Sequence, residues 1–250
     1  MKYALVNNNK VEAAKGLKGI CPICHESVIP KCGQMKIHHW AHIKQTHCDK
    51  WWENETDWHR NWKNQFPEEW QEVVTFDNET GEKHIADIKT NFNFVVEFQH
   101  SFITDEERVS RECFYKNMIW VVDGTRRKRD YKKFLDAFEF RDIWHAPKSP
   151  LFILECGYNY LPNEWLNSLF PVFFDFKGLL DGSSEDYKRD SLWCLLPIRG
   201  QNINVLICFP RVVFVKSIKE GGILYNSDKI VKDVNKLIQN RNNLRWISGI

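Results

Sequence analysis

Residues 83–99 read KHIADIKTNFNFVVEFQ, two apolar runs separated by a turn at Asn91-Phe92-Asn93. Side chains alternate faces along a strand, so Glu97 and Gln99 project side by side from an otherwise apolar strand. The turn sets a register that places Asp87 directly opposite Glu97, with Cβ atoms about 4.5–5.5 Å apart. Two carboxylates at that distance repel each other, which is a reason to expect a cation between them. The alternative is an ordinary exposed sheet face that carries Asp and Glu, and the hairpin alone does not decide between the two.

The segments around this hairpin predict an α-β-β-β-α-β order between residues 54 and 123. A helix is expected over 54–66, with Asn54 as its N-cap and Pro67 after its end. The elements expected after it are strands at 72–76, 83–90 and 93–99, a helix at 104–115 and a buried strand at 118–123.

Beyond residue 150 the sequence predicts further strands but no assignable chemistry. The segment 146–150, APKSP, is typical of a boundary. We expect an α+β protein of three parts: a module at 1–50, a core at 51–145 and a β-rich region at 146–250. In the last part a helix is expected near 228–239, and apolar strands at LFILEC (151–156), PVFFDF (171–176), SLWCLLPI (191–198), NVLICF (204–209) and RVVFV (211–215).

Composition limits the classes of protein that this chain can be. A hydrophobic content of 43% supports a packed core, and a net charge of +2 rules out wholesale electrostatic capture of nucleic acid, so such binding needs local patches. No run of 18 apolar residues exists, which excludes a spanning helix. The first residues, MKYALVNNNKVEAAKG, lack the pattern of a secretory signal. We therefore expect a cytoplasmic protein without a membrane partner.

Cysteine and histidine residues crowd the first fifth of the chain. Cys21 and Cys24 form a CPIC motif, and His39 and His42 follow in HWAH. Two thiolates and two imidazoles satisfy a tetrahedral zinc ion, and four protein ligands make the site structural. The inner His spacing is shorter than in common zinc fingers, so three alternates for the fourth ligand stay open: His38, His47 and Cys48. The competing interpretation is a redox or incidental CxxC with surface histidines. The four later cysteines are scattered in apolar surroundings and are expected to be small buried side chains.

The predicted helix at 54–66 brings a further acid toward the core. On a helical wheel Trp58, Trp62 and Phe66 form one stripe, Glu55 falls inside it and His59 lies at its edge. A core-facing acid is rarely unpaired, so Glu55 is expected at the Asp87/Glu97 site. The alternative is that Glu55 only interacts with the helix dipole.

A basic run provides the expected contact with nucleic acid. Residues 125–133 read TRRKRDYKK, in which Arg126, Arg127, Lys128 and Arg129 are candidate phosphate contacts. Arg111 and Tyr115 share a face of the preceding helix and are candidates too. The alternative is an ordinary solvated loop.

Several of these motifs together resemble those of the competence protein CoiA-like family, within the PD-(D/E)XK nuclease superfamily. They are CPIC, HWAH in place of an H-F-A-H, the E-x-x-x-H of Glu55 and His59, ADI, VEFQHS, RECFY and IWVVD. The resemblance runs from about residue 20 to residue 123. It implies a restriction-endonuclease-like core in which Asp87 and Glu97 bind a divalent ion.

The resemblance also implies roles for the neighbouring residues. Glu55 is the helical acid, and Gln99 stands where most of the superfamily has lysine, which leaves open how charge on the transition state is neutralised. The Phe98 carbonyl, between the two site residues, is a natural third oxygen ligand, and His59 either supports catalysis or only packs against Trp62.

The implied activity is Mg²⁺- or Mn²⁺-dependent hydrolysis of DNA, single-stranded or foreign DNA included, in competence-related processing or defence. The alternative is a non-catalytic, zinc-containing DNA-binding module on a degenerate nuclease fold. A third alternative is a purely structural or partner-binding protein, with the C-terminal region as the surface for a homodimer or a partner protein.

Overall fold

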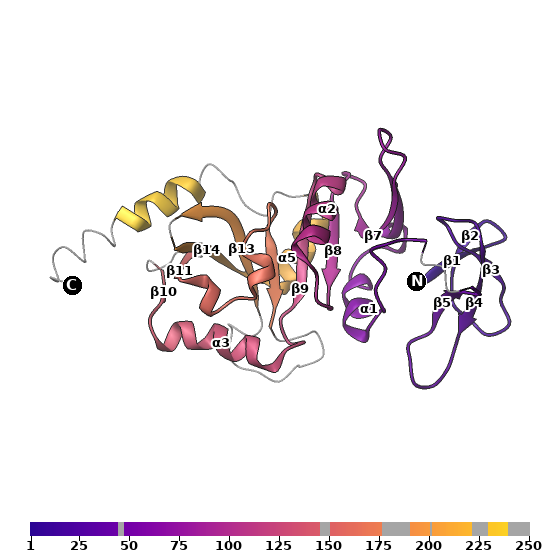
Figure 1. Ribbon diagram of the computed structural model, residues 1–250, viewed down its shortest axis with the longest axis horizontal. Helices are drawn as coiled ribbons and strands as arrows, with labels where there is room; N and C mark the ends of the chain where they lie inside the picture. Colours follow the sequence, from indigo (N-terminus) through magenta and orange to yellow (C-terminus); the bar gives the residue numbers. More distant parts are fainter. Residues whose placement is uncertain (45–47, 146–150, 177–190, 201, 222–229, 240–250) are drawn as a thin grey trace. The chain divides into compact units, whose positions relative to one another are not determined.

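The computed structural model describes the chain except for residues 45–47, 146–150, 177–190, 201, 222–229 and 240–250. The chain divides into two compact units, Met1–Met118 and Ile119–Ile250 (Figure 1). The segment 146–150, expected as a boundary, lies outside the described residues, and the three-part division stays a prediction. Among the described residues, no helix has the length and apolarity needed to cross a bilayer.

The N-terminal part of unit 1 is an antiparallel sheet in the order β2-β1-β3-β4-β5 (Figure 1). Trp40 is the largest side chain of its small core and is 1% exposed. The strands are β1 (Tyr3–Val6), β2 (Asn9–Glu12), β3 (Gly19–Ile20), β4 (Ser27–Lys31) and β5 (His39–His42).

The rest of unit 1 follows the predicted order of elements. Its strands pair antiparallel in the order β6-β7-β8, and Trp62 of α1 stacks on Phe98 of β8 with ring centroids 5.7 Å apart. The elements are α1 (Asp57–Lys63), the 3₁₀ turn η1 (Glu68–Trp70), β6 (Gln71–Phe76), β7 (Lys83–Lys89), β8 (Val95–Gln99) and α2 (Asp105–Tyr115), and β9 (Met118–Asp123) comes next along the chain.

Helix α1 is shorter than the sequence predicts. The Thr56 side chain accepts a hydrogen bond from the His59 backbone N–H, and the His59 ring reaches back to the Thr56 N–H. This capping box makes Thr56 the N-cap in place of Asn54. The expectation that Glu55 lies within the helix is therefore wrong, because Glu55 precedes the cap.

The hairpin register is as predicted. Ile88 pairs with Val96 and Lys89 with Val95, so the same register places Asp87 opposite Glu97. On the other side of β7, Val73 pairs with Ala86 and Gln71 with Ile88, which places Glu72 opposite Asp87. Three carboxylates thus form one row across β6, β7 and β8.

Unit 2 is built on a sheet in the order β10-β11-β14-β13-β12-β9, in which β9 and β12 are parallel and the other pairs antiparallel. Phe134 of α3 packs on Trp193, and Phe214 of α5 packs on Phe173 of β12. Phe173 lies next to Phe174, the cross-strand partner of Trp193, so α3 and α5 cover opposite faces.

The remaining bounds are α3 (Lys128–Glu139), β10 (Ile143–Trp144), β11 (Leu151–Glu155), the 3₁₀ turns η2 (Gly157–Asn159) and η3 (Asn163–Trp165), β12 (Val172–Asp175), β13 (Ser191–Gly200), β14 (Ile203–Pro210), α5 (Arg211–Lys219) and a helix over 230–239.

The strand predicted at 211–215 is wrong, because these residues begin α5. Pro210 is the N-cap, where its missing N–H costs nothing. Phe214 and Ile218, four residues apart, are buried, whereas Val212 is 76% exposed. This is the period of a helix with one buried face, and a five-residue apolar run is too short to distinguish it from a strand.

Candidate functional site

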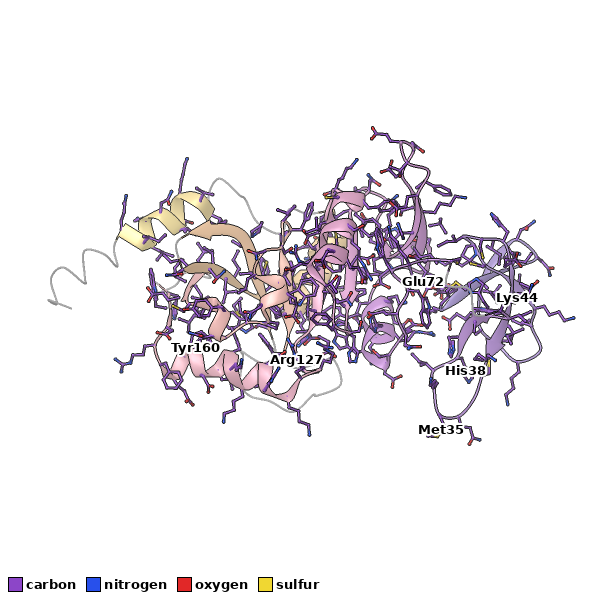
Figure 2. All side chains as sticks on the ribbon, in the orientation of Figure 1. Met35, His38, Lys44, Glu72, Arg127 and Tyr160 are labelled. Atoms are coloured by element: carbon purple, nitrogen blue, oxygen red, sulfur yellow. The ribbon has the colours of Figure 1, made fainter. Side chains whose placement is uncertain are left out.

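Unit 1 contains a cavity of about 240 Å³ between its N-terminal sheet and α1, β7 and β8. Two of the lining residues, Glu72 and Lys44, are labelled in Figure 2. Most of the predicted acidic site lines this cavity. The lining includes His39, Trp40, Ala41, His42, Lys44 and Cys48 from the N-terminal part, and Asp49, Trp51, Trp52, Glu53, Glu55, His59, Lys63, Glu72, Ile85, Asp87, Glu97, Phe98 and Arg111 from the rest.

Carboxylates replace part of the backbone pairing between β7 and β8. The Asp87 N–H donates to Glu97 Oε1 over 3.1 Å, and the Phe98 N–H donates to Asp87 Oδ2 over 3.0 Å. Each acid therefore satisfies a backbone donor of the opposite strand. These contacts fix both carboxylates at the point where the hairpin opens.

Glu72 completes the row on β6 in a strained conformation. Its φ of +46° lies in the left-handed region that a residue with a side chain rarely adopts. Its carboxylate accepts hydrogen bonds from the N–H groups of Lys2 (2.8 Å) and Tyr3 (3.0 Å) on the N-terminal sheet. The strain is therefore held by contacts that dock this sheet on the core.

Two buried cations lie against the row of carboxylates. The Lys63 ammonium lies 2.9 Å from Glu72 Oε1 and 3.6 Å from Asp87 Oδ1. Burial opposes ionisation of Lys63, but the neighbouring carboxylates outweigh burial and raise its pKa. Arg111 of α2 approaches from the other end, with Nη1 3.2 Å from Glu97 Oε2.

These cations do not compensate the acid pair fully. Burial, and then the charge of Asp87, raise the pKa of Glu97 to about 8, although Arg111 works in the opposite direction. Burial likewise raises the pKa of Asp87 against the charges of Lys63 and His59. The repulsion between the Asp87 and Glu97 carboxylates is therefore only partly relieved, and a cation bound between two carboxylates is one means of relieving it.

His59 and Gln99 meet at an acid that the sequence analysis missed, Glu53. His59 Nε2 donates to Glu53 Oε1 over 2.6 Å and lies 3.1 Å from the Phe98 carbonyl oxygen. Gln99 Nε2 donates to Glu53 Oε2 over 3.2 Å. Burial favours the neutral acid, but the His59 hydrogen bond and charge outweigh it and lower the pKa of Glu53 to about 2.

The Glu55 side chain is only 7% exposed, but among the contacts of the described residues it has none with Asp87 or Glu97. Its carboxylate binds Arg60 Nη2 at 2.6 Å and Lys63 Nζ at 2.8 Å. Lys63 therefore stands between Glu55 and Asp87. The side chain of α1 that lies next to the acid pair is therefore Lys63, and not the predicted Glu55.

Lys63 and Glu53 differ in whether the sequence could have indicated them. Lys63 lies four residues after His59, so the two share a helical face, and that spacing was readable. Glu53 precedes the helix in an irregular segment, where no periodicity indicates which way a side chain points.

A second cluster lies in the N-terminal part, where Cys21, Cys24, His42 and Cys48 bring one ligand atom each within 4.8 Å of one another. Cys24 Sγ lies 3.3 Å from His42 Nε2, and Cys48 Sγ lies 3.6 Å from Cys21 Sγ. Ligands about 2.0–2.3 Å from a tetrahedral zinc ion are separated by about 3.3–3.8 Å. Burial raises the pKa of both the Cys21 and the Cys48 thiol. This Cys₃His set could therefore hold a metal ion such as zinc.

The structure puts Cys48 in the group where the sequence analysis puts His39. Residues three apart on a strand point to opposite faces, so His39 and His42 of β5 cannot both face the cysteines. The His39 ring instead contacts the Ile37 carbonyl over 2.8 Å. The alternate His38 also lies outside the group, and its carbonyl accepts a hydrogen bond from Arg60. The alternate His47 lies outside the described residues.

The predicted nucleic-acid contacts fall into two groups. Arg111 and Tyr115 are buried, 5% and 8% exposed, so neither lies on an open binding face. The second group is the basic run in unit 2, where Lys128 and Arg129 are exposed at the start of α3. Arg127 is held by Asp130 (2.7 Å) and Glu164 (3.0 Å), and Arg126 is half-buried.

A family model described as "Competence protein CoiA, N-terminal domain" matches residues 5–50. The match includes all four members of the Cys₃His cluster and supports the CoiA family for this part of the chain. No curated protein and no solved structure matches the chain.

Proposed function

We propose that the protein is a divalent-metal-dependent nuclease that hydrolyses phosphodiester bonds of DNA. One observation carries the proposal: the half-buried carboxylate of Asp87 and the buried carboxylate of Glu97 face each other in a cavity, and the pKa of Glu97 is raised to about 8. A bound cation would stabilise the ionised form of a carboxyl group whose pKa is raised in this way. Perturbed acids in a cavity are typical of catalytic sites.

Asp87, Glu97 and the Phe98 carbonyl would hold the ion. A bound Mg²⁺ or Mn²⁺ supplies a water that is activated near neutral pH and a Lewis acid for the phosphoryl oxygens. The chain positions the ligands: Phe98 lies between the two site residues of β8, and its N–H already fixes Asp87. His59 orients Glu53 beside the Phe98 carbonyl.

Lys63 can supply the positive charge that the Gln99 side chain lacks. The amide of Gln99 cannot carry charge, but the ammonium of Lys63, 3.6 Å from Asp87, supplies a fixed positive charge in the same cavity. We assign Lys63 the electrostatic part of the role that lysine has at the Gln99 position in most of the superfamily. Gln99 orients Glu53 through its Nε2.

The family match at residues 5–50 suggests a competence-related role, and the cluster of Cys21, Cys24, His42 and Cys48 would bind a structural zinc ion. The substrate would be DNA, single-stranded or foreign DNA included. Lys128 and Arg129 would add salt-sensitive phosphate contacts.

The second candidate function is a non-catalytic, zinc-containing DNA-binding module. It is favoured by the carboxylates of Glu55 and Glu72, which lie 2.8 and 2.9 Å from Lys63 and could absorb its charge completely.

Cleavage assays separate the two functions. Supercoiled, linear and single-stranded DNA are incubated with Mg²⁺, Mn²⁺ or EDTA. We expect wild-type cleavage that depends on the ion, and background activity for Asp87→Ala. Asp77→Ala, at the exposed turn between β6 and β7, is the matched control and should cleave like wild type. No cleavage of any substrate, or equal cleavage by Asp87→Ala, refutes the nuclease proposal.

A further inference from the structure

The segment 48–53 connects the Cys₃His cluster to residues that hold both strands of the acidic site. It begins at Cys48, whose sulfur is a member of the cluster. It ends at Glu53, which binds His59 and Gln99. Between them, Asp49 and Trp51 are buried, 8% and 7% exposed. A segment this short, fixed at both ends, transmits a displacement of one end to the other.

Asp49 ties the segment to β7, the strand that carries Asp87. Its Oδ2 accepts a hydrogen bond from the Ile85 N–H over 3.0 Å, and its Oδ1 lies 2.8 Å from His84 Nδ1. The same Oδ1 accepts the Trp51 N–H over 3.0 Å. Asp49 therefore holds the backbone two residues before Asp87, and it follows Cys48 directly.

Trp51 ties the segment to Glu97 on the other strand. Its carbonyl accepts a hydrogen bond from Arg111 Nη2 over 2.9 Å, while Arg111 Nη1 pairs with Glu97 over 3.2 Å. The Trp51 ring stacks on His84 at an interplanar angle of 18°. One guanidinium thus shares its donors between the connecting segment and the acid of β8.

We infer that Asp49 is a positioning residue that makes the divalent-ion site of Asp87 and Glu97 depend on metal binding by the Cys₃His cluster. With zinc bound, Cys48 is fixed, and Asp49 and Trp51 hold both strands of the acid hairpin in one register. Without zinc, the start of the segment loses its anchor, and the two carboxylates lose their common geometry. The cluster is then a condition for the acidic site as well as a support of the N-terminal sheet.

The proposed function supplies the divalent site on which this inference rests. Groups that orient metal ligands through hydrogen bonds typically contribute about 10- to 100-fold to metal affinity. We expect a loss of that size when Asp49 can no longer hold the Ile85 N–H and His84 together.

The test is an Mn²⁺ titration of the zinc-loaded full chain, with free Mn²⁺ measured by electron paramagnetic resonance. Thiolate sites prefer zinc to Mn²⁺, so the probe reports the carboxylate site. Asp49→Asn should keep its zinc and lose about 10- to 100-fold in Mn²⁺ affinity. Asp77→Asn makes the same chemical change at an acid that accepts two N–H groups in the β6–β7 turn. Its Mn²⁺ affinity should equal that of wild type.

Zinc removal provides the second arm. Wild type stripped of zinc should lose Mn²⁺ affinity, whereas Asp49→Asn should lose little more, because the connection is already broken. An equal loss in both proteins would contradict transmission through Asp49. Where Asp49→Asn does not fold, His84→Gln removes one partner of Asp49 and should show a smaller loss in the same direction.

Three outcomes are decisive. Zinc-loaded Asp49→Asn or His84→Gln with wild-type Mn²⁺ affinity overturns the inference and leaves the nuclease proposal standing. Wild type that binds no Mn²⁺ overturns both. A loss of Mn²⁺ affinity at full zinc content, absent from Asp77→Asn, supports the positioning role.

Discussion

The two units bury ions to different extents. Unit 1 buries ions next to one another: Lys63, Glu97 and Arg111 are 3–5% exposed. In unit 2, α3 and α5 cover the sheet mainly with rings such as Phe134 and Phe214, both fully buried, and Arg211 of α5 pairs with the fully buried Asp175. Apolar side chains of similar volume often stabilise a fold as well as buried ion pairs do, or better. The clustered buried ions of unit 1, which stabilise a fold no better than rings would, are therefore the feature that distinguishes the unit with the candidate site.

Among the changes that would test this difference between the units, loss of zinc from unit 1 is expected to have the largest effect. Structural zinc sites contribute about 10–16 kcal/mol of apparent binding energy in zinc-finger peptides. Cys48→Ser should lower zinc content and protein yield, as measured by metal analysis of the purified chain. His39→Asn should keep the zinc, and so should Cys208→Ala in unit 2. Zinc loss in His39→Asn with retention in Cys48→Ser would reverse the ligand assignment.

The next effect concerns the buried lysine. Lys63→Met leaves the carboxylates of Glu55, Glu72 and Asp87 without their shared cation, which should cost about 3–5 kcal/mol of unfolding free energy. Denaturant unfolding measures this loss. Lys133→Met, on the exposed face of α3, should change stability by less than about 0.5 kcal/mol. Equal stability of the two variants would show that unit 1 does not depend on its internal ions.

A smaller effect is a pH dependence of stability in protein that has zinc but no other divalent ion. The pKa of Glu97 is raised from 4.5 to about 8, so the native state binds more protons than the unfolded chain between these values. Stability should therefore fall as pH rises through this window, by at most about 1.4 kcal/mol per pH unit for one proton. Unfolding across the window measures the slope, which Glu97→Gln should reduce. Glu53, with a pKa of about 2, makes stability depend on pH only below about pH 4.5, outside this window. An unchanged slope in Glu97→Gln would contradict the assignment.

The smallest effect on stability is expected from the surface of unit 2. Lys128→Glu with Arg129→Glu should leave the fold intact and flatten the salt dependence of DNA binding. The slope of log K against log salt concentration should become shallower by about 0.7–0.9 for each phosphate that the variant no longer neutralises. Lys216→Glu with Lys219→Glu on α5 is the control of equal charge. The same slope in wild type and both variants would mean that the basic run is only solvated surface.

The sequence predicts best where a local period fixes the structure. Alternation along 93–99 and the turn at Asn91–Asn93 were enough for the register of Asp87 and Glu97. It predicts least where partners are distant in sequence. Glu53 meets Gln99, and Glu72 meets Lys2, only through tertiary packing.

Two errors share a physical cause, namely that the spacing of residues was not converted into the direction of their side chains. A strand at 39–42 turns His39 away from His42, so the two imidazoles cannot bind one ion there. The apolar run at 211–215 has the opposite problem, because it is helical where a strand was expected. Both errors could have been avoided only with knowledge of the neighbouring elements.

The central claim is that Asp87 and Glu97 together hold a divalent ion, and Mn²⁺ stoichiometry tests it most directly. Zinc-loaded wild type and Glu97→Gln are titrated in parallel, with Asp77→Asn as the control. We predict saturable binding of Mn²⁺ in wild type and in Asp77→Asn, and no saturable binding in Glu97→Gln, which should fold at least as well. Wild type without saturable binding, or Glu97→Gln with the same affinity as wild type, would contradict the account.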